Sequence, residues 1–123
     1  MIEILIIDDD EDIRFIVKMI LERSGAYHVH EAETAAEGKS RFQQIHPDVL
    51  LLDYMLPDSR GLDLLREIQS DDLLGATQVI ILTARKDPAL EAEFIKAGAS
   101  AIMHKPFDTG EFLSTLESHL ESS

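Results

Sequence analysis

The chain has 123 residues, and its 24 acidic side chains outnumber its 11 basic ones, which gives a formal net charge of −13. This length suits a single domain over residues 1–123, and the 45% hydrophobic content is typical of a folded protein and argues against disorder. The acidic excess disfavours nucleic acid and anionic membranes as direct partners, because both carry phosphate charge. A basic protein surface, or a cation held by acidic side chains, suits this charge better.

Several classes of protein are disfavoured by what the chain lacks. No apolar run approaches the roughly 20 residues that a membrane span needs, so we expect no membrane insertion. The start of the chain has no basic region and meets acidic residues from Asp8 on, so we do not expect a signal peptide. With no cysteine there is neither a disulfide framework nor a thiolate metal site. These features together predict a cytoplasmic protein.

The first part of the chain predicts two strands, each followed by a helix. The apolar run Ile2–Ile7 predicts a strand, and Tyr27–Ala32 shows the weaker alternation of a second one. Thr34 and Glu37 match a capping box, which predicts the start of a helix that continues to Ile45. Between the two strands, a helical stripe is formed by Ile13, Ile16, Val17, Ile20 and Leu21.

The rest of the chain continues the alternation. The run Val49–Leu52 is apolar on both faces, as expected of a parallel strand that is covered on both sides. The later elements are a helix after Gly61, a strand at Val79–Leu82, a helical stripe from Leu90 to Gly98, a strand at Ala101–Met103 and a helix capped by Asp108 with Glu111.

Five strands that alternate with five helices predict the α/β class, as a doubly wound parallel sheet with helices on both faces. In such folds the site lies beyond the carboxyl ends of the strands, where the strand order reverses. The residues that follow each apolar run therefore carry the functional information.

Polar residues stand at four of these ends, namely Asp8–Asp10, Asp53, Thr83 and Lys105. Because neighbouring strands lie about 4.8 Å apart, carboxylates that end two strands can converge on one ion. Carboxylate and carbonyl oxygens are the ligands that suit Mg²⁺. A lysine can balance the acids or bind a phosphoryl group, and a threonine hydroxyl can donate to a phosphoryl oxygen.

An aspartate beside Mg²⁺, a lysine and a threonine can accept a phosphoryl group by in-line attack. Asp53 is the best candidate nucleophile, because it stands alone at the end of a central strand. Asp8 and Asp9 are better candidates for metal ligands. Asp10 is better explained as a helix N-terminal residue, which the helix dipole favours.

Four segments carry a resemblance to a known family, and they follow one another in the family's order. They are IIDDDEDIR at Ile6–Arg14, LLLDYMLPDSRGLDLL at Leu50–Leu65, ILTA at Ile81–Ala84 and AGASAIMHKPF at Ala97–Phe107. The sequence resembles the receiver domains of two-component response regulators, and it is similar to the single-domain chemotaxis type. The resemblance covers essentially the whole chain, and it implies the strand order 2-1-3-4-5.

The resemblance also implies a role for each residue of the acidic group. Asp53 would be phosphorylated by a sensor histidine kinase or a histidine phosphotransfer protein. The metal ligands for Mg²⁺ would be Asp8, Asp9, Asp53 and the backbone carbonyl of Met55. The chain would signal through a changed protein-binding surface, without acting as an enzyme beyond transfer to and hydrolysis from its own aspartate.

Further positions match the family or depart from it. By resemblance, Thr83 would sense the phosphoryl group and Lys105 would contact it, next to a Lys105–Pro106 bond that is usually cis in the family. Gly61 matches the loop after the phosphorylated strand. Ile102 stands where many receivers have an aromatic side chain, which argues against an aromatic switch at this position.

The five histidines lack the spacing of a metal site. His28 and His30 could share one face of a strand, but such a pair is more often a surface feature than a ligand set. We therefore interpret these two residues as surface side chains.

Alternatives from other classes are weaker. A haloacid-dehalogenase-type phosphatase would use Asp8 and Asp10 as its D-x-D signature, but the chain has no further acidic motif or cap after Lys105. Three aspartates after the first strand would repel the phosphate of a flavin. A receiver-like interaction module that works without phosphorylation stays open. The sequence contains no DNA-binding segment, so we expect a downstream protein target or an output domain outside this chain.

Overall fold

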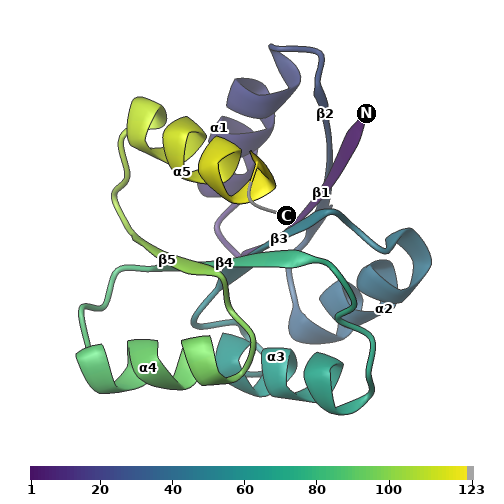
Figure 1. Cartoon of the computed structure of the whole chain (residues 1–123), viewed down its shortest axis with the longest axis vertical. Coiled ribbons are helices and arrows are strands. Elements are labelled where there is room, and N and C mark those ends of the chain that lie inside the picture. Colours follow the sequence, from purple (N-terminus) through teal and green to yellow (C-terminus); the bar gives the residue numbers. More distant parts are fainter. Residues whose placement is uncertain (122–123) are drawn as a thin grey trace.

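The computed structural model describes residues 1–121, which form strands and helices in strict alternation (Figure 1). Every predicted element is present, although β3, β4 and β5 run one residue further than predicted, to Asp53, Thr83 and His104, and β4 starts one residue earlier, at Gln78. In chain order, the elements are β1 (Ile2–Ile7), α1 (Glu11–Glu22), β2 (Tyr27–Ala32), α2 (Ala35–Ile45), β3 (Val49–Asp53), α3 (Gly61–Ser70), β4 (Gln78–Thr83), α4 (Pro88–Lys96), β5 (Ala101–His104) and α5 (Thr109–Glu121).

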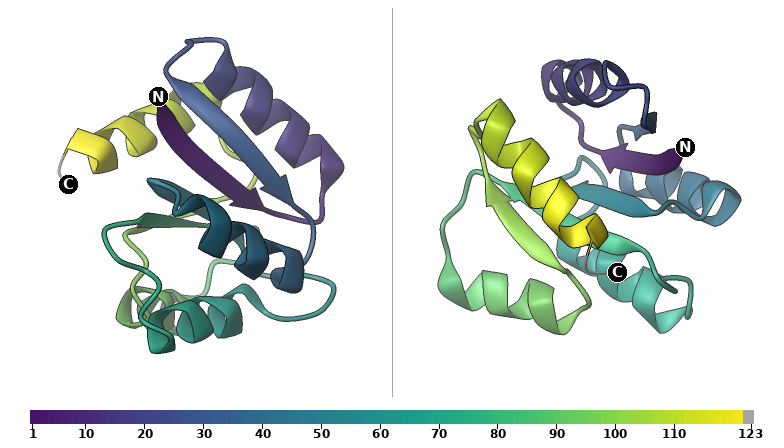
Figure 2. Two further views of the ribbon diagram at one scale, coloured as in Figure 1. Left: turned by 90° about the vertical axis from the view of Figure 1, so that its right-hand side faces the viewer. Right: turned by 45° about the horizontal axis from the view of Figure 1, so that its top comes forward.

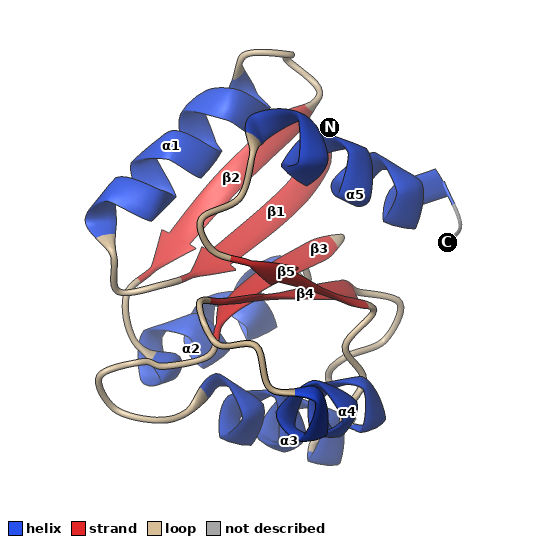
Figure 3. Ribbon diagram, turned by 90° about the vertical axis from the view of Figure 1, so that its left-hand side faces the viewer, coloured by secondary structure: helices blue, strands red, loops and turns tan. Residues whose placement is uncertain are grey.

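The strands form one parallel sheet in the order β2-β1-β3-β4-β5, which confirms the predicted fold class and strand order. Helices α1 and α5 cover one face of the sheet, and α2, α3 and α4 cover the other (Figure 3). The two further views in Figure 2 show the same three layers. No helix within residues 1–121 is long and apolar enough to cross a membrane.

The sheet separates two hydrophobic cores, because successive side chains of a strand point to opposite faces. In β1, Ile4 and Ile6 pack in the core under α1 and α5, whereas Leu5 and Ile7 pack in the core under α2, α3 and α4. All five residues of β3 are buried. The apolar run in β3 thus has the two-sided cover that the sequence predicts, and β3 is the central strand of the sheet.

Side chains before the helices cap them much as predicted. Asp10 caps α1 by accepting hydrogen bonds from the backbone N–H groups of Asp12 and Ile13, which confirms its interpretation as a helix N-terminal residue. Thr34 caps α2 and accepts from the N–H of Glu37 at 3.1 Å. The Glu37 carboxylate reaches one residue beyond the predicted capping box, because it accepts from Glu33 N at 3.0 Å.

The predicted apolar stripe of α1 is wrong at one position. Val17 and Leu21 are fully buried, but Ile16 is 42% exposed. The inward face of α1 also includes Arg14, which precedes Val17 by three residues and Leu21 by seven. Arg14 turns inward because two hydrogen-bond acceptors are available there, the backbone oxygen of Asp8 and the carboxylate of Glu31. Ile16 lies at the margin of the buried face.

Candidate functional site

The four predicted polar positions lie at the carboxyl edge of the sheet. Asp53 and Thr83 are the last residues of β3 and β4, whereas Asp8 and Lys105 follow directly after β1 and β5. Because β1, β3, β4 and β5 are neighbours in a parallel sheet, their ends meet at one edge. The Lys105–Pro106 peptide bond is cis, as the resemblance implies.

Asp8 is fully buried, and it is held by both its backbone and its side chain. Its Oδ1 accepts a hydrogen bond from the backbone N–H of Asp10 at 2.9 Å, and its Oδ2 accepts from Lys105 Nζ at 2.7 Å. Arg14 Nη1 donates to the backbone oxygen of Asp8 at 2.6 Å, while Arg14 Nε donates to Glu31 at 3.2 Å. These contacts fix the end of β1.

The sequence reasoning missed Arg14 because a search for apolar stripes disregards charged residues. A signal was present, since Arg14, Val17 and Leu21 have the spacing of one helix face. An arginine on a buried helix face needs hydrogen-bond acceptors, and the end of the neighbouring strand supplies one.

Lys105 joins the acidic residues of β1 and β3. Its Nζ lies 2.7 Å from Asp8 Oδ2 and 3.3 Å from Asp53 Oδ1. Burial acts to lower the pKa of Lys105, but the hydrogen bond to Asp8 and the charges of Asp53 and Asp8 outweigh it and raise the pKa. Lys105 therefore remains a cation, and it partly neutralises the two carboxylates.

Asp53 is a carboxylate whose ionisation is opposed by its surroundings. Burial, followed by the charge of Asp8, raises the pKa of Asp53 from 3.8 to about 6, although Lys105 acts in the opposite direction. A group with this pKa is still mostly ionised at pH 7. A further cation at this position would favour the ionised form more strongly.

The acidic residues have the geometry and the chemistry of a site for a hard divalent cation. Asp8, Asp9 and Asp53 each offer one carboxylate oxygen, and these three oxygens lie within 4.8 Å of one another. Octahedral Mg²⁺ binds oxygen at about 2.1 Å, so ligands on opposite sides of the ion are roughly 4.2 Å apart. Three carboxylate oxygens gathered this closely are a donor set that suits Mg²⁺. The predicted role of the Met55 carbonyl stays a prediction.

A pocket of about 370 Å³ opens beside Asp53. Thr83 is nearly buried in its wall, and Thr83 Oγ1 accepts a hydrogen bond from Arg85 N at 3.0 Å. This bond uses an acceptor site of the hydroxyl and leaves its hydrogen free to donate. The pocket is lined by Asp53, Tyr54, Met55, Thr83, Ala84, Arg85 and Lys105.

The loop after β3 is fixed against Asp53 by Gly61. The N–H of Gly61 donates to the carbonyl oxygen of Tyr54 at 2.6 Å, and a Cβ atom at Gly61 would overlap the carbonyl oxygen of Asp53. Only glycine lets the start of α3 approach the end of β3 this closely. The sequence match at Gly61 thus has a steric cause that is specific to the site.

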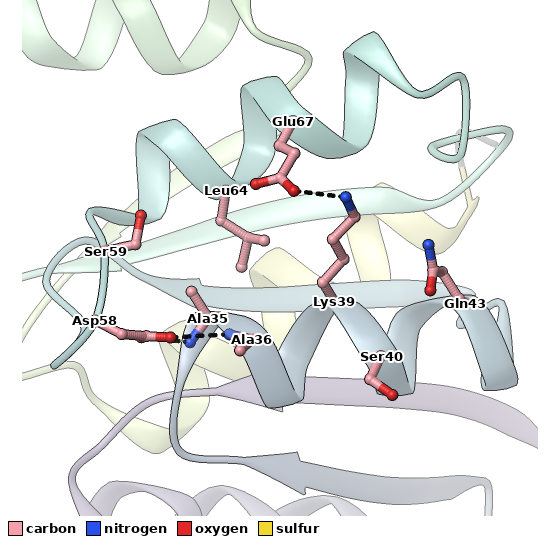
Figure 4. Close-up of a pocket in the computed structure, with 9 residues that line it drawn as sticks. All are labelled: Ala35, Ala36, Lys39, Ser40, Gln43, Asp58, Ser59, Leu64 and Glu67. Atoms are coloured by element: carbon pink, nitrogen blue, oxygen red, sulfur yellow. Dashed lines mark hydrogen bonds and ion pairs between the residues drawn. The ribbon is translucent and has the colours of Figure 1, made fainter.

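Asp58 ties the same loop to the start of α2. Its carboxylate accepts hydrogen bonds from Ala35 N at 2.7 Å and from Ala36 N at 3.0 Å (Figure 4). These backbone N–H groups, Ala35 first, hold the pKa of Asp58 below its usual value. The loop that carries Met55 is therefore fastened at Asp58, by α2, and at Gly61, by Tyr54.

A larger pocket, of about 600 Å³, lies between α2 and α3 and contains none of the predicted site residues (Figure 4). Lys39, which lines this pocket, forms ion pairs with Glu67 and, at 2.8 Å, with Asp71. All three side chains are partly exposed, in contrast to the buried group around Asp8. The larger of these two pockets is therefore not the one that contains the predicted site residues.

Tyr54 supplies an aromatic side chain near the site, although Ile102 does not. Ile102 is partly buried and packs against the core under α2, α3 and α4. The Tyr54 ring meets Phe94 of α4 edge to face, with centroids 5.9 Å apart, and the Arg85 guanidinium carbon lies 5.9 Å from the Tyr54 centroid. The sequence reasoning missed Tyr54, whose signal was its position directly after Asp53.

Comparisons with known proteins agree with this geometry. A family model described as response regulator receiver domain matches residues 4–117. The chain is 35% identical to the transcriptional regulatory protein TrcR of Mycobacterium tuberculosis over 122 residues, which are 99% of this chain and 46% of TrcR. It is 32% identical to the chemotaxis protein CheY of Listeria monocytogenes, with 95% of this chain and 97% of CheY covered.

A solved structure shows the same fold. The CheY-like receiver domain protein of Methanospirillum hungatei matches with a TM-score of 0.91 and 30% identity, over 99% of this chain and 95% of that one. The chain spans about half the length of TrcR and nearly all of CheY. It belongs to the response regulator receiver domain family, whose members act in phosphorylation-dependent two-component signalling.

Proposed function

We propose that the chain is a phosphorylation switch in which Asp53 accepts a phosphoryl group from the phosphohistidine of a sensor histidine kinase or a phosphotransfer protein. The observation that carries this proposal is the position of the Asp53 carboxylate. It stands at the end of the central strand, 3.3 Å from Lys105 Nζ, and it has an oxygen within 4.8 Å of oxygens of Asp8 and Asp9.

Asp53 is a better nucleophile than either of the other two aspartates. Asp53 lines the open pocket, whereas Asp8 is fully buried and Asp9 is exposed outside that pocket. A phosphatase of the haloacid-dehalogenase type would use Asp8 as its nucleophile, and the burial of Asp8 argues against that reaction. Asp8 is in addition held by Lys105, which suits a ligand that stays in place.

In the transfer step, an Asp53 carboxylate oxygen attacks phosphorus, and the bond from phosphorus to the histidine nitrogen breaks. Lys105 holds a positive charge where the phosphoryl oxygens arrive, and the Thr83 hydroxyl donates to one of them. Mg²⁺ held by Asp8, Asp9 and Asp53, together with the Met55 carbonyl, would stabilise the charge of the transferring group. Self-catalysed hydrolysis would later return Asp53 to its carboxylate.

Thr83 connects phosphorylation to the surface. Its hydroxyl oxygen holds the N–H of Arg85, so a new bond from Thr83 to a phosphoryl oxygen pulls on residues 84–87, which join β4 to α4. Tyr54 lies between Arg85 and Phe94, so it can pass this movement on to α4. We infer that the surface of α4, β5 and α5 changes and binds a downstream protein or an output domain.

The partners follow from this reaction. A phosphohistidine donor must bring its imidazole to the mouth of the pocket beside Asp53 and Met55. The formal charge of −13 suits a donor or target with a basic docking surface. A sensor histidine kinase obtains the phosphoryl group from ATP, which is available in the cytoplasm. The proposal therefore places the chain there.

Intact mass after incubation with acetyl phosphate and Mg²⁺ tests the proposal. We expect one phosphoryl adduct on the parent chain and none on Asp53→Asn, because an amide is not a nucleophile for this transfer. Asp71→Asn is the matched control, since Asp71 is an exposed aspartate that pairs with Lys39 and does not line the pocket beside Asp53. This control is expected to accept the phosphoryl group. Removal of Mg²⁺ is expected to abolish the adduct on both the parent chain and the control.

Two outcomes would contradict the proposal. An adduct that persists in Asp53→Asn would assign the nucleophile to another residue. No adduct on the parent chain, either with acetyl phosphate or with a phosphorylated histidine phosphotransfer protein, would favour an interaction module that works without phosphorylation.

A further inference from the structure

A second group of metal-binding side chains lies at the opposite edge of the sheet, at the amino ends of β1 and β2. Glu3 of β1 pairs directly with His28 of β2, and His30 follows two residues later on the same face. The intervening residue, Val29, points into the core under α1 and α5. We call Glu3, His28 and His30 the His–Glu cluster.

The ligand atoms of the His–Glu cluster converge on one another. His28 Nδ1 lies 2.9 Å from Glu3 Oε1, and His30 Nε2 lies 3.3 Å from Glu3 Oε2. The two imidazole rings lie side by side, with centroids 4.3 Å apart and planes tilted by 54°. One nitrogen from each ring and one carboxylate oxygen all lie within 4.8 Å of one another.

The cluster is accessible, and it rests on rigid backbone. The side chains of His28, Glu3 and His30 are 50%, 33% and 21% exposed, so an ion can reach them from solvent. The backbone N–H of Glu3 donates to Asp48 Oδ2 at 2.8 Å, and the N–H of Asp48 donates to Glu3 O at 2.8 Å. Because paired strands hold all three residues, little order has to be gained when an ion binds.

The carboxylate is in the form that a metal needs. The hydrogen bond to His28 lowers the pKa of Glu3 most strongly; burial opposes this effect, and the hydrogen bond to His30 adds to it. Glu3 is therefore ionised at neutral pH. Each histidine ring offers one nitrogen as a ligand.

We propose that Glu3, His28 and His30 form a surface site for a first-row divalent ion of the zinc type. Zinc binds imidazole nitrogen and carboxylate oxygen at about 2.0–2.2 Å, which puts tetrahedral ligands roughly 3.3 Å apart. Measured to the single oxygen Glu3 Oε2, His28 Nδ1 lies at 3.2 Å and His30 Nε2 at 3.3 Å, which are both near this value. A water molecule can complete the coordination from the solvent side.

The donor atoms separate this site from the acidic pocket in chemistry as well as in place. Asp8, Asp9 and Asp53 offer carboxylate oxygens, which suit Mg²⁺, whereas the His–Glu cluster offers two imidazole nitrogens, which suit zinc, copper and nickel. Saturating Mg²⁺ will therefore occupy the acidic pocket and leave the His–Glu cluster free for zinc.

The chain contains a matched pair that lacks the second histidine. His104 Nε2 lies 3.3 Å from Glu91 Oε2, which is the same separation as between His30 and Glu3. A single histidine with one carboxylate provides two ligands instead of three, and it is expected to bind zinc far more weakly. His104→Gln is therefore the control variant.

Calorimetric titration with zinc chloride in excess Mg²⁺ tests the site. We expect one zinc ion to bind per chain, with affinity reduced in His28→Ala and in His30→Ala by at least the roughly 10–100-fold that loss of even an outer-shell partner costs. His104→Gln is expected to bind as the parent does. The imidazole NMR signals of His28 and His30 should shift when zinc binds. Circular dichroism should show that each histidine variant is folded.

Three results would overturn the proposal. Zinc affinity that is unchanged in both folded histidine variants would exclude the cluster. Zinc binding that disappears in Asp8→Asn, but persists in His28→Ala, would assign the ion to the acidic pocket. Absence of binding at millimolar zinc would leave these residues as a histidine–glutamate ion pair without a metal.

Discussion

The two edges of the sheet carry polar groups of opposite character. At the carboxyl edge, Asp8 and Asp53 are buried and share the cation Lys105, whereas at the amino edge Glu3 is partly exposed and contacts His28 and His30. The pKa of Asp53 is raised to about 6 by burial and by Asp8, while the pKa of Glu3 is lowered by its hydrogen bond to His28.

The difference shows that the surroundings of a carboxylate, more than its position on a strand, decide its chemistry. At the carboxyl edge, loops and helix ends enclose the acids, so burial disfavours ionisation of Asp53 and the cation Lys105 favours it. At the amino edge, solvent and imidazole stabilise the charge directly. The first edge is therefore suited to a hard cation and a phosphoryl group, and the second to a softer metal ion.

Removal of Lys105 should produce the largest effect, because it leaves two buried carboxylates without their cation. We expect Lys105→Met to lower the free energy of unfolding in metal-free buffer by roughly 2–4 kcal/mol, somewhat below the cost of breaking a fully buried ion pair. Urea denaturation at pH 7 measures this loss. Mg²⁺ should restore more stability to the variant than it adds to the parent.

Lys39→Met is the matched control, because Lys39 also contacts two carboxylates, Glu67 and Asp71, but on the surface. Its loss is expected to be much smaller, since exposed ion pairs contribute little. Equal losses in the Lys39 and Lys105 variants would contradict the view that burial distinguishes the acidic group.

A substitution at Gly61 should have the next largest effect on stability, because it forces the loop away from Asp53. We expect Gly61→Ala to lower the free energy of unfolding by roughly 1–3 kcal/mol, as is typical of an added methyl group in a packed site. It should also slow phosphorylation by acetyl phosphate, since the Cβ would displace the end of β3.

Ser59→Ala, in the same loop, should change stability by less than about 0.5 kcal/mol, as most surface substitutions do. If Gly61→Ala is equally mild and phosphorylates at the parent's rate, the close approach of this loop is not what shapes the pocket. Zinc binding at the His–Glu cluster should be the same in both variants.

The smallest effects should appear in the pH dependence of the two edges. In metal-free buffer, the raised pKa of Asp53 favours folding at low pH, and this contribution is lost as the pH rises from 3.8 to about 6. The lowered pKa of Glu3 has the opposite sign, because its contribution is present above 4.5 and is lost as the pH falls through the folded-state value.

Carbon NMR of the side-chain carboxyl groups can follow both titrations in one experiment. We expect Asp53 to titrate above 3.8, near 6, and Glu3 to titrate below 4.5. His28→Ala should move the Glu3 titration upward and leave that of Asp53 unchanged. If the pKa values of Asp53 and Glu3 were both raised, or both lowered, from their usual values, the contrast between the two edges would be contradicted.

Much of the acidic group could be predicted because it depends on local pattern. Apolar runs identify the strands. The polar residue at the end of each strand is then the one that follows its apolar run, Asp53 after Val49–Leu52 and Thr83 after Val79–Leu82. In a parallel sheet these ends meet at one edge, so Asp53, Thr83 and Lys105 could be brought together before any contact was known.

The sequence reasoning was weaker wherever a residue acts through a distant partner. Arg14 was not recognised, because its role depends on Asp8 O and Glu31, which belong to the ends of β1 and β2. His28 and His30 were interpreted as surface residues, because nothing within β2 indicates that Glu3 faces them. The register of β1 against β2 supplies that third side chain.

The sequence by itself determined the alternation of strands and helices, the strand ends and the residue types available for chemistry, because these depend on periodicity and near neighbours. Only the tertiary structure decided which aspartate is open to a donor, which way each pKa moves and how closely Gly61 approaches Asp53. Those properties depend on burial and on through-space distances between segments far apart in the chain, and such distances exist only after the segments pack together.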